Sequence, residues 1–198
     1  MARYTNVTSL DDIRDRSAPA QTVDERALRE QLAAAYRIFD HLGWTQLIFG
    51  HITARVPGPE GHILINPFGL MFDEITASNL VKIDLDGNIV GDSDHPVNPA
   101  GFTIHSAIHA ARPDVQCVMH AHTRAGMAVA ALADGLNTCD FSGISLYNRV
   151  AYHDFEGVTI RLDERDRLVG SLGDRDMMVL RNHGLLSCGA SVPEAFMH

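Results

Sequence analysis

The stretch Val115–Thr123, with the sequence VQCVMHAHT, indicates the fold most directly. It begins with an apolar pattern typical of a buried strand and ends in two histidines, His120 and His122. Side chains two residues apart in a strand point to the same face, so the two imidazoles lie side by side, about 7 Å apart along the backbone. Such a pair suits a divalent metal ion such as zinc, iron, copper or nickel. Because H-x-H pairs also occur in cores and at surface edges, the pattern alone does not decide the matter.

A second apolar segment, Met177–Arg181, also runs into a histidine. It is followed by Asn182, His183 and Gly184. Two strands that each stop at a histidine could bring three ligands to one ion and leave a coordination position open, as catalytic metal sites do. We expect Asn182 to shape the turn that aims His183, and Gly184 to permit the backbone conformation of that turn.

The composition is ordinary for a globular protein, with 198 residues, 45% hydrophobic and 21% charged. This length supports one sizeable core, so we expect a single domain over residues 22–198 after a loosely ordered segment over residues 1–21. The formal net charge of −9 argues against nucleic acid or an anionic membrane surface as the partner. No apolar run approaches the length of a membrane span.

The three cysteines, Cys117, Cys139 and Cys188, are odd in number and far apart in the sequence. They fit neither a disulfide framework nor a CxxC zinc site, so we expect reduced thiols. The first residues contain no apolar segment of the kind found in secretory signal peptides. These features predict a cytoplasmic protein.

The first half of the domain predicts one helix and two hairpins. A T-x-x-E capping box begins at Thr22, and the apolar stripe behind it is closed by Gly43. Residues 48–56 and 62–67 are strand-like on either side of a turn and predict the first hairpin. Asp86-Gly87 lies between two further apolar runs and predicts the second.

The second half alternates helices with short strands. Pro99 and Pro113 bound a helix just before the histidine strand, and a helix over Arg124–Ala133 follows that strand. Further short strands are predicted at residues 150–155, 157–162 and 176–181. Strands that are first paired in hairpins and then separated by helices predict a mixed sheet with helices packed on it.

A second capping box, Ser191–Glu194, predicts a helix start near the end of the sequence. The few residues that follow Glu194 are too short for a stable helix. We therefore expect that the chain is cut short at its C-terminal end relative to its natural length.

In its motifs the chain resembles the class II aldolase/adducin family. The motifs that carry this resemblance are FGHITAR at 49–55, INPFGLMFDEITASNLVKID at 65–84, VNPAGFTIHSAIHAARPDVQCVMHAHT at 97–123 and LRNHGL at 180–185. The resemblance covers nearly everything from Asp24 to the end and is greatest to the head domain of adducin and to adducin-like bacterial proteins. It implies an α/β/α sandwich, in which a mixed, mostly antiparallel sheet carries helices on both faces.

The resemblance also implies a metal site and an assembly. His120, His122 and His183 match the family's metal ligands, and zinc is the usual ion, with Fe²⁺, Mn²⁺ or Co²⁺ as alternatives. The aldolases and the pentulose-phosphate epimerase of the family form cyclic tetramers with active sites between neighbours. The resemblance therefore implies a homo-oligomer, in the first place a tetramer, that acts on a small molecule.

The sequence departs from the sugar-phosphate aldolases of this family at the substrate site. Those enzymes carry a glutamate that donates and accepts a proton where this chain has Gly101 or a neighbour within one residue of it. One phosphate-binding turn becomes Gly50–Thr53, with His51 at an asparagine position, and another becomes Phe68-Gly69. We expect the substrate contacts to come from Gly50, His51, Thr53, Gly69, Asn98 and Gly101.

A metal held by three neutral histidines keeps its full positive charge and is a strong Lewis acid. The predicted function is a metal-dependent lyase that cleaves a carbon–carbon bond, by aldol cleavage or decarboxylation, through a metal-stabilised enolate. The substrate would be a small hydroxy-carbonyl or carboxylic compound rather than an ordinary sugar phosphate. Two alternatives stay open, a non-catalytic adducin-like binding or assembly module and a non-haem iron oxygenase on the same fold.

The candidate bases for this chemistry are His105, His51, a metal-bound water and a residue from a neighbouring subunit. His105 matches a recurrent family position near the pocket. A packing role fits His105 equally well. His109 lies four residues later on the same helix face, so the two could chelate an ion. The segment lacks the glutamate of an H-E-x-x-H zinc motif, which excludes that type of protease.

Overall fold

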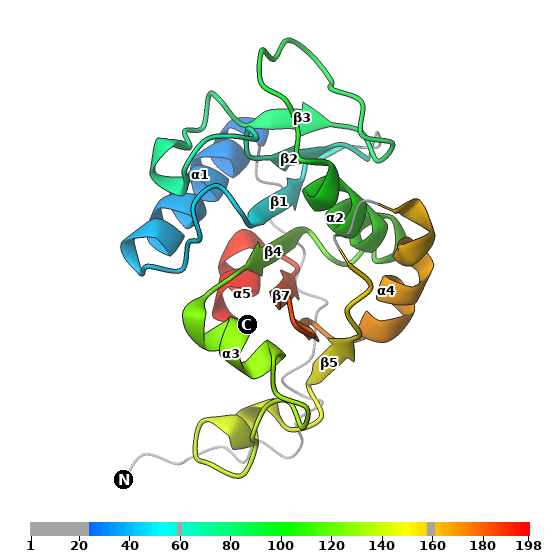
Figure 1. The fold of residues 1–198 in the computed structure, drawn as a ribbon. Helices are drawn as coiled ribbons and strands as arrows, with labels where there is room; N and C mark the ends of the chain where they lie inside the picture. Colours follow the sequence, from blue (N-terminus) through cyan, green and yellow to red (C-terminus); the bar gives the residue numbers. More distant parts are fainter. Residues whose placement is uncertain (1–23, 59–60, 158–160) are drawn as a thin grey trace, which may run out of the picture.

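The computed structural model describes residues 24–58, 61–157 and 161–198 (Figure 1). The predicted loose segment, 1–21, lies outside the described residues, and so does the middle of the strand predicted at 157–162. The helices are α1 (Glu25–His41), α2 (Pro99–Ala111), α3 (Arg124–Ala130), α4 (Arg165–Leu172) and α5 (Val192–Met197). The strands are β1 (His51–Arg55), β2 (Ile63–Ile65), β3 (Val81–Ile83), β4 (Cys117–Ala121), β5 (Val150–His153), β6 (Met177–Leu180) and β7 (Gly184–Gly189).

These strands form one seven-stranded sheet in the order β3-β2-β1-β4-β7-β6-β5. Every neighbouring pair is antiparallel except β5 and β6, which are parallel. Helices α2 and α4 lie on one side of the sheet, and α1, α3 and α5 lie on the other (Figure 1). The predicted fold class, a mostly antiparallel mixed sheet with helices on both faces, is confirmed.

The alternation of side chains along β4 explains both layers of the core. Val118 packs with Ile104 of α2 in one apolar cluster. Met119 packs with Tyr36 of α1 in another cluster on the opposite face. His120 therefore shares the face that α2 covers, two residues beyond Val118. The sheet thus carries the histidine into the layer between β4 and α2.

Helix α1 begins immediately after Asp24, whose carboxylate accepts a hydrogen bond from the Ala27 N–H at 2.7 Å. Thr22, where the sequence predicted the cap, lies outside the described residues. Four residues of the predicted stripe, Leu28, Leu32, Ala35 and Phe39, are buried along α1, whereas its last residue, Leu42, is exposed. Ala33 and Tyr36 are buried as well. Gly43 follows the helix end with a φ of +68°, as expected of a residue that terminates a helix.

The first predicted hairpin is present as β1 and β2. The second is shorter than predicted, because β3 meets the chain after Asp86-Gly87 through a single bridge between Ile83 and Ile89. The turn itself forms as expected: Gly87 has a φ of +91°, and the Asp84 carboxylate accepts hydrogen bonds from backbone N–H groups within it.

Two elements in the last third were not predicted, and one formed against expectation. β7 follows His183 directly and lies between β4 and β6 in the centre of the sheet. α4 buries Leu168 and Leu172 against the layer that contains α2. α5 forms although it is short, because Val192 and Ala195 pack against the sheet and Ser191 caps its first turn.

Candidate metal centre

Three histidines converge where the end of β4 lies beside the beginning of β7. His120 is in β4, His122 follows that strand, and His183 lies in the turn between β6 and β7. Their ring centroids are 4.7 Å apart for His120 and His122, 4.7 Å for His120 and His183, and 4.9 Å for His122 and His183. One nitrogen from each lies within 4.8 Å of the others, and among the described residues no carboxylate or thiol joins this group.

Hydrogen bonds on the outer side of the rings fix which nitrogens face the centre. The Nδ1–H of His120 donates to the Leu185 carbonyl at 2.9 Å, and the Nδ1–H of His122 donates to the Gln46 side-chain oxygen at 2.8 Å. Each neutral ring then has a bare Nε2, and these two nitrogens are 2.9 Å apart. Two facing lone pairs repel each other unless a cation binds both. Metal-binding histidines usually have this arrangement, in which one nitrogen donates to an outer partner and the other is left for the ion. This donor set fits a divalent metal ion.

The electrostatic environment keeps these imidazoles neutral. Burial, followed by the neighbouring histidines, holds the pKa of His120 well below its usual value. Burial also lowers the pKa of His122 and brings the pKa of His183 to about 4. At neutral pH the rings therefore offer lone pairs, which is the state that metal binding requires.

Glycines on either side of β4 allow the rings to approach. A Cβ atom on Gly184 would lie 2.7 Å from the Ala121 carbonyl oxygen and 2.9 Å from the His122 ring. Gly184 was expected to adopt a special backbone conformation, but the residue with a left-handed φ, +54°, is Asn182. Gly184 is needed for space instead. Gly50 is needed both for its backbone conformation and for space. Its φ is +94°, and a Cβ atom there would lie 3.0 Å from the His120 carbonyl oxygen.

His51 lies directly beside His120, because the two residues pair across β1 and β4. Their ring centroids are 5.2 Å apart, and the His51 side chain is buried. A Cβ atom on Gly101, in the first turn of α2, would lie 2.7 Å from the His51 ring. Gly101 therefore leaves the space that the His51 imidazole fills, and a larger side chain at 101 would displace the ring.

Behind His51 lies His105, with a ring contact of 5.2 Å to it. The Thr53 hydroxyl bridges His105 Nδ1 at 2.8 Å and His109 Nε2 at 2.9 Å. Thr53 is fully buried, so its hydroxyl is already used within the protein and presents no free group to a substrate. His105 is also fully buried. It contacts His51, and His51 contacts His120, so the His51 ring connects His105 to the three histidines.

The remaining predicted contact residues lie in turns or caps. Gly69 is exposed with a φ of +101°, and nothing lies within 4 Å of its Cβ position. The Asn98 side-chain oxygen accepts a hydrogen bond from the Ala100 N–H at 3.0 Å and caps α2. Glu74, a carboxylate near the family motifs, accepts from the Met71 N–H at 2.7 Å in a local turn. The role of each in substrate binding stays a prediction.

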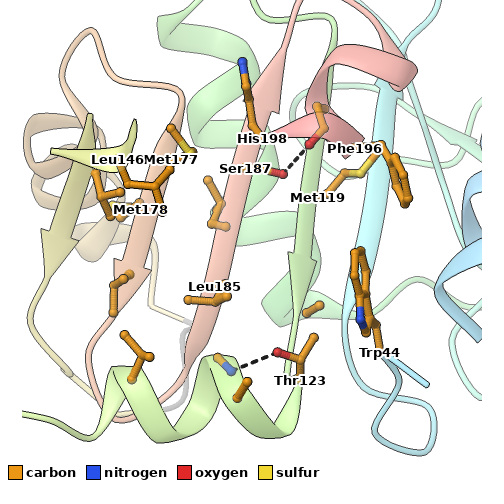
Figure 2. Close-up of a pocket in the computed structure, with 18 of the residues that line it drawn as sticks. Trp44, Met119, Thr123, Leu146, Met177, Met178, Leu185, Ser187, Phe196 and His198 are labelled. Carbon is orange, nitrogen blue, oxygen red and sulfur yellow. Dashed lines mark hydrogen bonds between the residues drawn. The ribbon is translucent and has the colours of Figure 1, made fainter. Parts of the chain in front are cut away.

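An apolar cavity lies between α3 and α5, on the face of the sheet opposite to α2 (Figure 2). Its volume is about 490 Å³, and Trp44, Met119, Leu185 and Phe196 line it. Its polar groups pair locally, as in the hydrogen bond from the Ser187 hydroxyl to the Ala195 carbonyl at 2.7 Å. Within the described residues, histidine side chains converge at His120, His122 and His183 and not in this cavity.

Three partners of the site were not identified from the sequence as such. Gln46 lies 76 residues before His122 in a segment without a motif, and the Leu185 carbonyl acts through the backbone. His109 was noted as a possible chelating partner of His105, but the structure joins the two through a hydroxyl. Helical spacing showed that His105 and His109 lie on the same side of the helix, but it could not show that Thr53 contacts both of them.

Comparison with known proteins gives a family that covers most of the chain. The family described as Class II Aldolase and Adducin N-terminal domain matches residues 30–198. Alpha-adducin of Rattus norvegicus is 48% identical over 195 residues, which is 97% of this chain and 26% of that protein. The chain thus spans about a quarter of alpha-adducin, and it spans 66% of a matching protein of Caulobacter vibrioides.

Solved structures agree with this match. A crystal structure of an aldolase II superfamily protein from Pseudomonas syringae is 54% identical, with a TM-score of 0.86 over 93% of this chain and 73% of that one. An L-fuculose 1-phosphate aldolase from Glaciozyma antarctica PI12 is 34% identical, with a TM-score of 0.75 over 85% of this chain and 66% of that one. Within the described residues, no helix is long and apolar enough to cross a membrane.

Proposed function

The chain belongs to the class II aldolase and adducin N-terminal domain family, and on that premise we propose that it is a metal-dependent lyase. Its reaction would cleave a carbon–carbon bond of a small hydroxy-carbonyl or carboxylic substrate. The observation that carries the proposal is the pair of bare Nε2 atoms of His120 and His122, 2.9 Å apart beside His183. His120 is buried and His122 is half-buried, and two facing acceptors in such a setting repel each other unless a cation joins them.

His120, His122 and His183 would hold the ion, and we propose zinc. A divalent ion held by neutral ligands supplies Lewis-acid activation of a carbonyl and stabilises negative charge on its oxygen. The protein's own residues would do the rest. Leu185 and Gln46 orient the ligand rings, and His51, in contact with His120, or His105 behind it would accept the proton.

We propose that ordinary sugar phosphates are not the substrates. Position 101 has no side chain, and the ring of His51 occupies the adjacent space in place of a carboxylate. The oxygen of Asn98 is engaged as a helix cap. These features support a smaller or differently charged substrate, although a relative named as an L-fuculose 1-phosphate aldolase shares the fold.

We also propose that the protein is a cytoplasmic homo-oligomer, in the first place a tetramer. The cavity of about 10 Å³ that adjoins His183 is lined by neither His120 nor His122, so it is not the space where a substrate would meet the three histidines. We propose that a second copy of the chain supplies walls for that space. Exposed apolar side chains at Phe141, Ile144 and Tyr147 offer a surface for such contacts. Three free cysteines fit a reducing compartment.

One observation favours a second function, a non-catalytic adducin-like binding or assembly module. Identity to alpha-adducin is 48% over nearly the whole chain, which is similar to the identity with the bacterial relative. In that case the metal would stabilise the fold. Metal binding without turnover, and an assembly state that depends on the metal, would favour this second function.

The first prediction concerns metal content. Protein purified without chelator should carry about one divalent ion per chain, and His120→Ala, His122→Ala or His183→Ala should lose it, because each change removes a ligand. Elemental analysis of the purified protein measures the ratio, and iron in place of zinc would favour oxygen chemistry. The control is His41→Ala, at the exposed end of α1, which should keep the ion. A wild-type protein that is folded and free of metal would contradict the proposal.

The loaded protein would then be tested on small hydroxy acids and hydroxy-carbonyl compounds. L-fuculose 1-phosphate and L-ribulose 5-phosphate serve as comparison substrates, for which we expect no turnover. A missing positioned acid–base group costs about 10²–10⁴ in rate. Cleavage of either sugar phosphate that His120→Ala abolishes would overturn the proposed substrate class.

A further inference from the structure

The three histidines of the candidate metal centre differ in what holds the outer side of each ring. His120 is bonded to the Leu185 carbonyl at 2.9 Å, and His122 is bonded to the Gln46 side chain at 2.8 Å. Within the described residues, the ring of His183 forms no hydrogen bond of this kind. Metal-binding histidines almost always donate their second ring nitrogen to a carbonyl, a carboxylate or a water molecule. The outer partner of the third ligand therefore has to be found in its surroundings.

A small cavity adjoins His183 on its outer side. Its volume is about 10 Å³, and neither His120 nor His122 lines it. One ring nitrogen of His183 faces those two histidines. The second nitrogen of an imidazole points to the other side of the ring, which is the side away from the metal centre. A cavity of about this size holds one water molecule when polar groups line it.

Polar groups from β5 and from the residue before α4 line this cavity. His153 ends β5, and its backbone carbonyl accepts from the Arg181 N–H at 2.9 Å, so the strand end lies beside the turn that carries His183. Glu164 immediately precedes α4, and its Oε1 lies 3.3 Å from His153 Nε2. His153 and Glu164 are each 5% exposed. A buried histidine–carboxylate pair therefore shares the cavity with His183.

The carboxylate of Glu164 is the member of this pair that suits a water molecule. Both ring nitrogens of His153 are engaged, because Nδ1 lies 3.0 Å from the Ser171 hydroxyl and Nε2 faces Glu164. An ionised carboxylate has about four acceptor positions, so Glu164 accepts further hydrogen bonds beside the one from His153. Glu156 also lines the cavity, but both of its oxygens bind Arg167, at 2.8 and 2.5 Å.

We infer that Glu164 and His153 are positioning residues for His183, and that they act through one ordered water molecule in this cavity. The outer N–H of His183 donates to the water, the water donates to the Glu164 carboxylate, and His153 holds that carboxylate in place. This chain of hydrogen bonds fixes the ring so that its other nitrogen faces the metal ion. The effect on metal binding rests on the proposed function, but the position of the water does not.

The water can be observed directly in crystals of the whole chain, grown with zinc and without metal, at a resolution that shows ordered water. We expect a water molecule within about 3.2 Å of the outer nitrogen of His183 and of a Glu164 oxygen in both forms. A cavity without water, or a direct protein partner for that nitrogen, would overturn the inference.

Glu164→Gln tests whether the carboxylate acts on metal binding. The change keeps the shape and removes the charge, so the affinity for zinc should fall about 10- to 100-fold in competition with a chromophoric chelator. Asp176→Asn is the matched control. Asp176 lies at the other end of β6 from His183, is 14% exposed in its side chain and contacts Arg112 at 3.3 Å. Its loss removes a similarly enclosed carboxylate and should leave the zinc affinity unchanged.

Cobalt supplies a measurement that a mere loss of stability does not alter. The visible absorption bands of bound Co²⁺ depend on the donor strength of its ligands, so they should shift in Glu164→Gln and stay in place in Asp176→Asn. Unchanged bands in a folded Glu164→Gln protein, or equal losses of zinc affinity in the two variants, contradict the positioning role. If Glu164→Gln fails to fold, His153→Gln is compared with Asp176→Asn in the same way.

This inference and the proposed function can fail separately. A wild-type protein that binds no divalent ion refutes the proposed function, and the water is then judged in the metal-free crystals. Equal zinc affinity in the wild type and in Glu164→Gln refutes the positioning role and leaves the proposed function standing.

Discussion

Gly101 and His51 depend on each other, and this dependence gives a prediction at the scale of single residues. In Gly101→Ala the new Cβ would lie 2.7–2.9 Å from atoms of the His51 ring, so the ring must move within a closed layer. Overpacking of this kind costs about 1–3 kcal/mol, which exceeds the gain of about 0.5–1 kcal/mol from alanine in a helix. We expect a lower free energy of unfolding in urea.

The matched control is Gly170→Ala in α4. This glycine is also helical, but it is exposed and has nothing within 4 Å of its Cβ position. The same substitution should there raise the free energy of unfolding by about 0.4–1 kcal/mol. Equal effects at the two positions would mean that His51 does not depend on the space at 101.

At this scale the sequence predicted which histidines lie together better than it predicted their contacts. The alternation in VQCVMHAHT placed His120 and His122 on one face, and the asparagine-histidine-glycine turn indicated His183. Contacts between distant segments, such as the one from His122 to Gln46, depend on the three-dimensional arrangement of the chain, so spacing could not show them.

At the scale of elements, the turn between β6 and β7 positions His183. Leu180 pairs with Gly184, so three residues close the turn, and Asn182 at its centre has a φ of +54°. Asparagine tolerates this conformation, whereas alanine loses about 1–2 kcal/mol there. Asn182→Ala should therefore lower both the free energy of unfolding and the ratio of bound metal to protein, because the neighbouring His183 shifts.

Asn182→Gly separates backbone from side chain. Glycine adopts positive φ freely, so this variant should keep the metal ratio of the wild type. The backbone N–H of residue 182, which donates to the Ala130 carbonyl at 2.9 Å, is present in both variants. If glycine lowers metal binding as much as alanine does, the Asn182 side chain rather than the turn conformation is responsible.

The elements that the sequence missed share a physical reason. β7 begins and ends in glycine and follows a turn at once, and α4 has only Leu168 and Leu172 as buried residues between charged ones. α5 is too short to be stable alone. All three are stabilised by packing on the central sheet, and local patterns carry little information about such packing.

At the scale of the whole molecule, the buried histidines should make stability depend on pH. The pKa of His109 is about 3 in the folded protein and about 6.5 when unfolded. A folded pKa below the unfolded one means that the unfolded chain binds more protons as the pH falls. In metal-free protein this group should leave stability unchanged above about pH 6.5 and lower it toward pH 3, by up to about 1.4 kcal/mol per pH unit.

Urea unfolding at a series of pH values measures this slope. His109→Gln should reduce the slope below pH 6.5, whereas His41→Gln, at the exposed end of α1, should leave it as it is. The same slope in the wild type and in His109→Gln would show that His109 is not held neutral by the fold.

The pairing of β4 with β7 has a consequence for the order in which the molecule assembles. Val118 pairs with Cys188 across a long intervening chain, so this pairing has a high entropic cost and forms slowly. The three histidines meet only when it is complete, and an ion bound there stabilises the finished protein alone. We therefore expect added metal to slow unfolding and to leave the rate of refolding nearly unchanged. The centre would then govern the lifetime of the folded protein rather than the speed at which it folds.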